Sequence, residues 1–148
     1  FDLVLASLHE SYGQDGSQLL ARYEAAMRHP LVTVITHPMN RQVPHRPGYD
    51  LDYDRFFAVA RETGTIVEID GAPGHMDLDG PLARRAVAAG VLLSIDSDGH
   101  RADRLSRQMQ IGVQLARRGW VPPDSVINTQ PIERLMDHVA AKKREWRA

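Results

Sequence analysis

Four histidine and aspartate residues stand shortly after apolar, strand-like runs of this chain: His9, His37, Asp98 and His100. Imidazole and carboxylate groups together suit zinc, manganese or iron. Around an open site they can lower the pKa of a bound water and neutralise charge on a phosphoryl oxygen. The chain contains no cysteine, which argues against a closed structural zinc site. These residue types therefore predict a hydrolytic metal centre.

The elements that must position these residues follow a regular alternation of apolar runs and helical periodicity. Expected strands cover residues 2–7, 31–36, 65–70 and 91–96, and expected helices cover about 17–28, 52–64, 81–90, 103–118 and 131–143. Asp52 is the expected N-cap of the second helix. This alternation predicts an α/β fold of right-handed βαβ units with a parallel sheet, either as an open doubly wound sheet or as a (β/α) barrel.

In such a fold the carboxyl ends of the strands meet on one face, where a barrel builds its active site. We therefore expect the four candidate ligands to converge there. Glu68 and Asp70 alternate along the third strand and share a face, so they could bind metal or pair with arginine. Asp96 could cap the next helix or support a ligand.

Other polar residues lie in the loops at the same end. Arg41 and Arg46 follow His37, and Arg101 follows His100, so all three could hold a phosphate or a DNA backbone through forked hydrogen bonds. The alternative is a solvated rim with surface ion pairs. Among the remaining histidines, we expect His45 and His75 to contact substrate, and His29 and His138 to lie on the surface.

Composition narrows the classes of protein. The 148 residues, 43% of them hydrophobic, suit a single domain covering 1–148, and a net charge of −1 gives no global field for nucleic acid or membranes. A local basic patch remains possible. No apolar run is long enough to span a bilayer, and the lack of cysteine fits a cytoplasmic protein. The chain starts directly in a strand, so we expect a fragment of a longer chain.

A family resemblance follows from the motifs taken in order: "ASLHES", "ITHPMN", "RPGYDLD", "IVEIDGAPGHMDLDG" and "LLSIDSDGH". From Phe1 to about Leu135, the chain resembles the C-terminal half of the PHP (polymerase and histidinol phosphatase) phosphoesterase domain. It looks most like the version attached to bacterial X-family DNA polymerases. Gly99 and the "EIDGAP" stretch depart from the family pattern but leave the ligand types intact.

The resemblance implies part of a distorted (β/α)7 TIM-like barrel around up to three zinc or manganese ions. His9 and His37 would ligate one metal, Asp98 a second and His100 a third, with Asp98 and His100 as catalytic residues. The family's other ligands, an early His-x-His pair and a bridging glutamate, lie upstream of the matched region. The expected partner is therefore a missing N-terminal barrel half or a polymerase domain.

The activity implied is phosphoester hydrolysis, in which a metal-bound hydroxide attacks phosphorus. The X-family likeness implies a 3′–5′ exonuclease or a 3′-phosphatase that acts on DNA ends in repair. A small-molecule phosphatase of the histidinol phosphate type is the alternative within the same class. A non-catalytic module that supports a polymerase is the alternative from another class.

Overall fold

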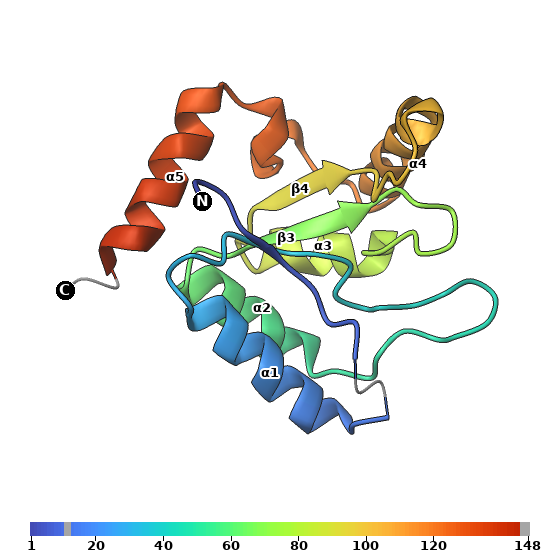
Figure 1. Ribbon diagram of the computed structural model, residues 1–148, viewed down its shortest axis with the longest axis horizontal. Helices are drawn as coiled ribbons and strands as arrows, with labels where there is room; N and C mark the ends of the chain where they lie inside the picture. Colours follow the sequence, from blue (N-terminus) through green and yellow to red (C-terminus); the bar gives the residue numbers. More distant parts are fainter. Residues whose placement is uncertain (11–12, 146–148) are drawn as a thin grey trace.

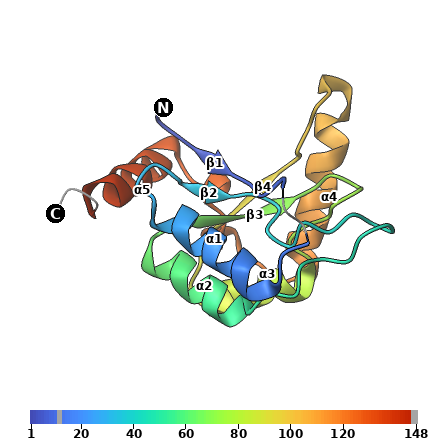
Figure 2. The same ribbon diagram turned by 60° about the horizontal axis from the view of Figure 1, so that its bottom comes forward.

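The chain forms a parallel four-stranded sheet in which the strands keep their sequence order. The computed structural model describes residues 1–10 and 13–145. The sheet order is β1-β2-β3-β4, and every neighbouring pair is parallel. The strands are β1 (Leu5–Ala6), β2 (Val34–Ile35), β3 (Ile66–Asp70) and β4 (Leu93–Asp96). Figure 1 labels β3 and β4, and Figure 2 also labels β1 and β2. The predicted α/β class and parallel sheet are confirmed.

Five α-helices connect and follow the strands. They are α1 (Gly16–Arg28), α2 (Tyr53–Glu62), α3 (Gly80–Ala88), α4 (Leu105–Arg118) and α5 (Ile132–Glu145). Figure 2 shows α1, α2 and α3 together on one side of the sheet. Short 3₁₀ turns occur at Ala102–Arg104, Pro123–Ser125 and Ile127–Thr129. In the described ranges, no helix has both the length and the apolar character needed to span a membrane.

Aspartate side chains begin the first three helices. The carboxylates of Asp15, Asp52 and Asp79 each accept a hydrogen bond from a backbone N–H in the first helical turn. Such caps satisfy donors that have no partner inside the helix. The N-cap predicted at Asp52 is confirmed.

The first two strands are much shorter than predicted, and the other two begin one and two residues later than predicted. The apolar runs 2–7 and 31–36 contribute only Leu5–Ala6 and Val34–Ile35 to the sheet. β1 is an edge strand, so it has a hydrogen-bonding partner on one side only. The helix expected over 103–118 also begins differently, because a 3₁₀ turn precedes α4. Side-chain periodicity thus located these elements, whereas the backbone pairing set their ends.

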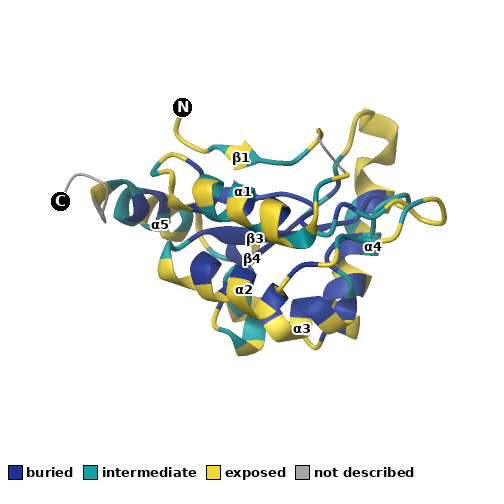
Figure 3. Cartoon of the chain, turned by 90° about the horizontal axis from the view of Figure 1, so that it is seen from below, coloured by how far each residue is buried: buried dark blue, intermediate teal, exposed yellow. Residues whose placement is uncertain are grey.

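The main core lies between the sheet and the helices α1, α2 and α3. Val67 and Ile69 of β3 face this core, with Tyr23, Phe56 and Phe57 packed edge to face from the helices. Figure 3 shows β3 and β4 buried and β1 more exposed. Side chains alternate along a strand, so the other face of β3 carries Ile66, Glu68 and Asp70. The candidate chemistry therefore lies on the side of the sheet opposite the main core.

The helix α4 crosses the carboxyl ends of β3 and β4 at very short distance. A Cβ atom on Gly71 would overlap the carbonyl oxygen of Gln108, and a Cβ on Gly112 would lie 2.8 Å from the Cγ2 atom of Ile95. Backbone atoms cannot move aside as a flexible side chain can. The missing side chains at these two glycines therefore allow α4 to pack against the sheet.

This contact gives a stability prediction. We expect Gly71→Ala to lower the free energy of unfolding by about 1–3 kcal/mol, because the new methyl group must push α4 away. Gly74→Ala is the matched control, since a Cβ at Gly74 meets no atom within 4 Å. Urea denaturation followed by circular dichroism measures both. Equal stabilities of the two variants would show that the close approach is not needed.

Candidate metal centre

One hollow of about 430 Å³ lies beyond the carboxyl ends of the strands. The structure brings all four predicted metal ligands to it, from the loops after β1, β2 and β4. The hollow is lined by His9, His37, Asn40, Gln42, Arg46, His75, Asp98 and His100. Residues far apart in the sequence thus share one site, as expected for parallel strands whose ends meet on one face.

His37 forms the most enclosed wall of this hollow. It is buried, has a φ of +30°, and its backbone N–H donates to Oε2 of Glu68 at 2.5 Å. Its ring lies 5.1 Å from that of His9 and stacks at 5.6 Å on that of His75, measured between centroids. Burial, and then the proximity of His9, lower the pKa of His37. Its imidazole is therefore neutral near pH 7, which is the form that binds metals.

Asp98 and His100 form the solvent-exposed mouth of the hollow. Asp98 has a φ of +41°, and its side chain is 32% exposed. The Nδ1 atom of His100 lies 2.8 Å from the Asp98 carbonyl oxygen and 3.9 Å from its carboxylate Oδ1. The His100 side chain is 84% exposed. Both side chains can therefore meet a ligand that arrives from solvent.

The donor types around the hollow suit a divalent cation, although their present spacing does not enclose one. Nδ1 of His37 is buried without a hydrogen-bond partner, although a buried ring nitrogen ordinarily has one. A metal ion would satisfy that lone pair, and the oxygen and nitrogen donors around the hollow suit zinc or manganese. Within residues 1–10 and 13–145, no three His, Asp or Glu side chains lie close enough to enclose an ion together. The four residues thus line an open hollow rather than a closed coordination sphere.

Three carboxyl groups lie beneath the site on β3 and β4. Burial, and then a hydrogen bond with Asp96, raise the pKa of Glu68 well above its ordinary value. Burial raises the pKa of Asp70 to about 7. Oδ1 of Asp70 accepts from the Ala72 N–H at 2.6 Å, while Oδ2 is buried without a partner. In the described part of the chain, none of these carboxylates forms an ion pair with arginine, which was one expectation for Glu68 and Asp70.

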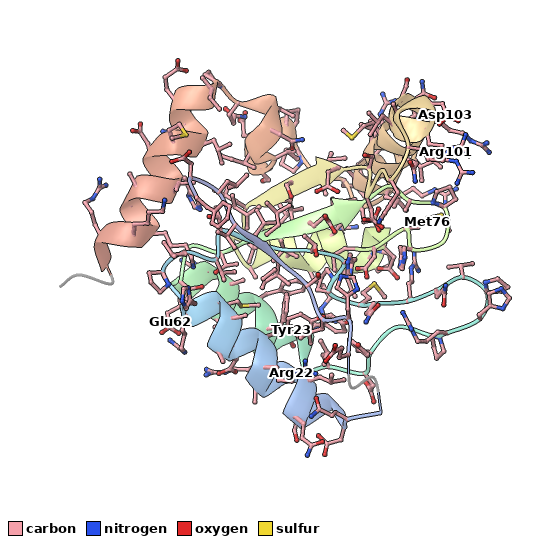
Figure 4. The ribbon with its side chains drawn as sticks, viewed as in Figure 1. Arg22, Tyr23, Glu62, Met76, Arg101 and Asp103 are labelled. Carbon is pink, nitrogen blue, oxygen red and sulfur yellow. The ribbon has the colours of Figure 1, made fainter. Side chains whose placement is uncertain are left out.

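The three candidate phosphate-binding arginines have different positions. Only Arg46 lines the hollow; its Nε and one terminal nitrogen donate to the backbone and side-chain oxygens of Asn40, both at 2.8 Å. Arg41 instead donates to the carbonyl oxygens of His75 and Met76. Arg101 pairs with Asp103 at 3.0 Å on the surface, where Figure 4 labels both residues. Arg41 thus fixes the loop after β3, and Arg101 points to a neighbouring acid.

Asn40 is a central residue of the site that the sequence did not reveal. It is buried with a φ of +47°, and its backbone N–H donates to Asp77 at 2.8 Å. Its side-chain nitrogen donates to the Leu8 carbonyl at 3.0 Å and to the Tyr49 hydroxyl at 2.6 Å. Asn40 therefore connects the loops after β1, β2 and β3. Its place three residues after His37 was the only signal available.

The positions of the other histidines agree only in part with the prediction. His75 lines the hollow as expected, and its Nδ1 lies 2.8 Å from the Arg41 carbonyl oxygen. His45 is exposed and does not line it. His138, expected on the surface, is half-buried and contacts the Gly64 carbonyl oxygen at 2.7 Å. Its contact across 74 positions of sequence was not readable from the local pattern.

Asp77, which supports Asn40, gives a pH-dependence prediction. Burial raises the pKa of Asp77 to about 7, against an ordinary value of 3.8. At a pH between these two values, the Asp77 carboxyl group is ionised in the unfolded chain but protonated in the native state. The stability contribution of Asp77 therefore falls as pH rises from about 4 to about 7, by at most about 1.4 kcal/mol per pH unit.

The comparison variant is Asp77→Asn, which has no proton to exchange at this position. We expect the wild type to become more stable relative to the variant, measured as the difference between their free energies of unfolding, as pH is lowered from 7 to 5. Urea unfolding of both proteins at each pH measures the difference. Two curves that stay parallel across this range would contradict the burial of an ionisable group here.

Comparison with known proteins gives two relatives, while no protein-family model matches the chain. The chain is 34% identical over 132 residues to a DNA polymerase/3′-5′ exonuclease, PolX, of Bacillus subtilis (strain 168). The aligned region covers 89% of this chain and 23% of that protein. It is 27% identical over 136 residues to a probable phosphatase of Syntrophotalea carbinolica. This aligned region covers 86% of this chain and 54% of that protein. The chain thus spans less than two thirds of either relative.

The first match covers 89% of the chain that carries the motifs of the family resemblance. Its name is that of an X-family enzyme, and the second relative is a probable phosphatase, which also fits a PHP segment. The resemblance is therefore confirmed: this chain is similar to part of a bacterial X-family DNA polymerase/3′-5′ exonuclease and to a probable phosphatase.

Proposed function

We propose that this chain is the C-terminal portion of a metal-dependent phosphoesterase that removes nucleotides or a phosphate from DNA 3′ ends. The observation that carries the proposal is the hollow itself. Four ligand-type residues from three strand ends line it together with the guanidinium of Arg46. The names of the two relatives, an exonuclease and a phosphatase, support the same reaction class.

His9, His37, Asp98 and His100 would hold zinc or manganese, up to three ions in the complete site. Bound there, the metal supplies an activated water and neutralises charge on the phosphate. As part of the proposal, the parallel sheet belongs to a (β/α)7 TIM-like barrel whose remaining strands come from a partner segment, an N-terminal barrel half or a polymerase domain. Asp98 and His100 would be the catalytic residues at the mouth.

The residues of this chain have separate tasks in that reaction. Arg46 would bind a phosphate oxygen, and Asn40 holds its guanidinium in a fixed direction by accepting two of its hydrogen bonds. Burial keeps His37 neutral and ready to donate a lone pair. The exposed side chain of His100 leaves the mouth open to a polymeric substrate.

A small-molecule phosphatase is the second candidate, favoured by the name of the relative from S. carbinolica. Both candidate enzymes break a phosphoester bond, so they differ only in the group that is attached to the phosphate in the substrate. A module without hydrolytic activity would need neither the buried free nitrogen of His37 nor Arg46 at the same hollow.

The test compares two esters with the complete phosphoesterase of the proposal, in which the N-terminal barrel half is joined to this chain. A 5′-labelled oligonucleotide with a 3′-phosphate and p-nitrophenyl phosphate are incubated with Mn²⁺ or with EDTA. We expect metal-dependent hydrolysis that EDTA abolishes and Arg46→Gln weakens. Arg28→Gln is the control, since Arg28 pairs with Glu62 on the surface of α1 and α2. Failure to hydrolyse either ester with Mn²⁺ or Zn²⁺ would overturn the proposal.

A further inference from the structure

A groove of about 450 Å³ runs along α4 beside the candidate site. Its polar rim consists of Arg107, Gln110, Gln114 and Arg118, and its apolar floor includes Ile111 and Met76. The rim positions recur every three or four residues, so they lie on one face of the helix, and all four side chains are exposed. Eleven residues separate the two arginines, which corresponds to about 16 Å along the helix axis.

The charge of this helix is unbalanced. α4 contains three arginines and no aspartate or glutamate. In the part of the chain that the structure describes, neither Arg107 nor Arg118 has a carboxylate within ion-pair distance. Arginines of the other helices differ, because Arg28, Arg55 and Arg85 each pair with a carboxylate of a neighbouring helix. The positive charge of α4 is therefore available to an anionic partner.

The groove and the candidate metal centre are lined by neighbouring residues of the loop after β3. His75 lines the hollow, and the next residue, Met76, lines the groove. His100 lies at the mouth of the hollow, and Arg107 follows it in the chain, after the 3₁₀ turn and in the first turn of α4. Figure 4 labels Met76 on the loop that lies beside α4. The loop after β3 thus contributes one residue to the hollow and the next residue to the groove.

We propose that the α4 groove binds the phosphate backbone of a nucleic-acid strand whose end lies in the hollow; this inference rests on the proposed phosphoesterase function. Arg107 and Arg118 contact phosphates, and Gln110 and Gln114 donate hydrogen bonds to phosphate or sugar oxygens. With a rise of about 3.4 Å per nucleotide, the rim spans about five nucleotides. A small phosphate ester could not reach both arginines, so the groove selects a polynucleotide.

The test measures binding apart from hydrolysis. A fluorescein-labelled 20-nucleotide oligothymidylate is titrated in EDTA with the wild-type chain, with Arg107→Gln/Arg118→Gln, and with the control Arg28→Gln/Arg55→Gln, while fluorescence anisotropy is recorded. Both variants lose two positive charges. We expect the groove variant to bind on the order of tenfold more weakly at 0.1 M salt, with the slope of log K against log salt smaller by about 1.4. The control keeps the wild-type affinity.

Three results would overturn this assignment: no binding by the wild type, equal losses in both variants, or displacement by poly-L-glutamate as efficient as by unlabelled oligonucleotide. Hydrolysis of p-nitrophenyl phosphate with Mn²⁺ by the complete phosphoesterase, in which the N-terminal barrel half is joined to this chain, reports on the proposed function separately. Hydrolysis without groove-dependent binding refutes the groove alone. Groove-dependent binding without hydrolysis supports the groove and refutes the phosphoesterase.

Discussion

Asp98→Asn is expected to abolish metal binding at the mouth of the hollow and to slow phosphoester hydrolysis by on the order of 100-fold or more. Asp98 is the carboxylate that lines the hollow together with four histidines, three of them candidate ligands. A neutral amide in its place is a much weaker ligand for a hard divalent cation. Hydrolysis of p-nitrophenyl phosphate and retention of Mn²⁺ after desalting measure the two effects.

This substitution separates chemistry from folding. Asp98 adopts a φ of +41°, a conformation that asparagine tolerates better than most residues. The side chain keeps its size and is partly exposed, so the variant should unfold at the same urea concentration as the wild type. Asp103→Asn, which only loses the surface pair with Arg101, is the matched control. Full activity and metal content in Asp98→Asn would refute the assigned role of this carboxylate.

Lys142→Met is expected to lower the free energy of unfolding by roughly 3 kcal/mol. The Nζ atom of Lys142 is buried and donates to the carbonyl oxygens of Met27 and Thr63, both at 2.8 Å, and to Oγ1 of Thr65 at 2.7 Å. These acceptors lie at the ends of α1 and α2, where a positive charge is favourable. Methionine has a similar length but no donor, so two buried acceptors and one partly buried acceptor would lose this partner.

The neighbouring Lys143 provides the control. Its Nζ donates to the Phe1 and Asp2 carbonyl oxygens at 3.3 and 3.2 Å in exposed positions. We expect Lys143→Met to change the free energy of unfolding by less than about 0.5 kcal/mol, since water replaces such bonds. Thermal or urea unfolding of the two variants gives the comparison. A Lys142 variant as stable as the Lys143 variant would show that α5 is held by apolar contacts alone.

The sequence predicted the elements that position the site because their signals are local. Apolar runs and helical periodicity gave the alternation, and an aspartate before the second helix gave its N-cap, where Asp52 accepts from the Arg55 N–H at 3.0 Å. The gathering of His9, His37 and Asp98 followed from topology, since parallel strands place their carboxyl ends on one face. No side-chain detail was needed for that step.

Contacts between loops that are distant in sequence could not be predicted from these local patterns. The direction of Arg41 depends on carbonyl groups 34 and 35 positions away, and that of Arg46 depends on the left-handed conformation of Asn40. Arg101 had a nearer partner, Asp103, but the sequence could not decide between this acid and a phosphate. Side chains in loops take the direction that their packed neighbours allow, so residue type alone cannot assign them to a site.

The most direct measurement is the metal content of the chain, by elemental analysis after saturation with Zn²⁺ or Mn²⁺ and exhaustive desalting. If His9, His37, Asp98 and His100 hold metal, the wild-type chain retains at least one ion and Asp98→Asn retains fewer. A wild-type chain that retains no ion, or a variant that retains as many as the wild type, would contradict a metal centre in this hollow.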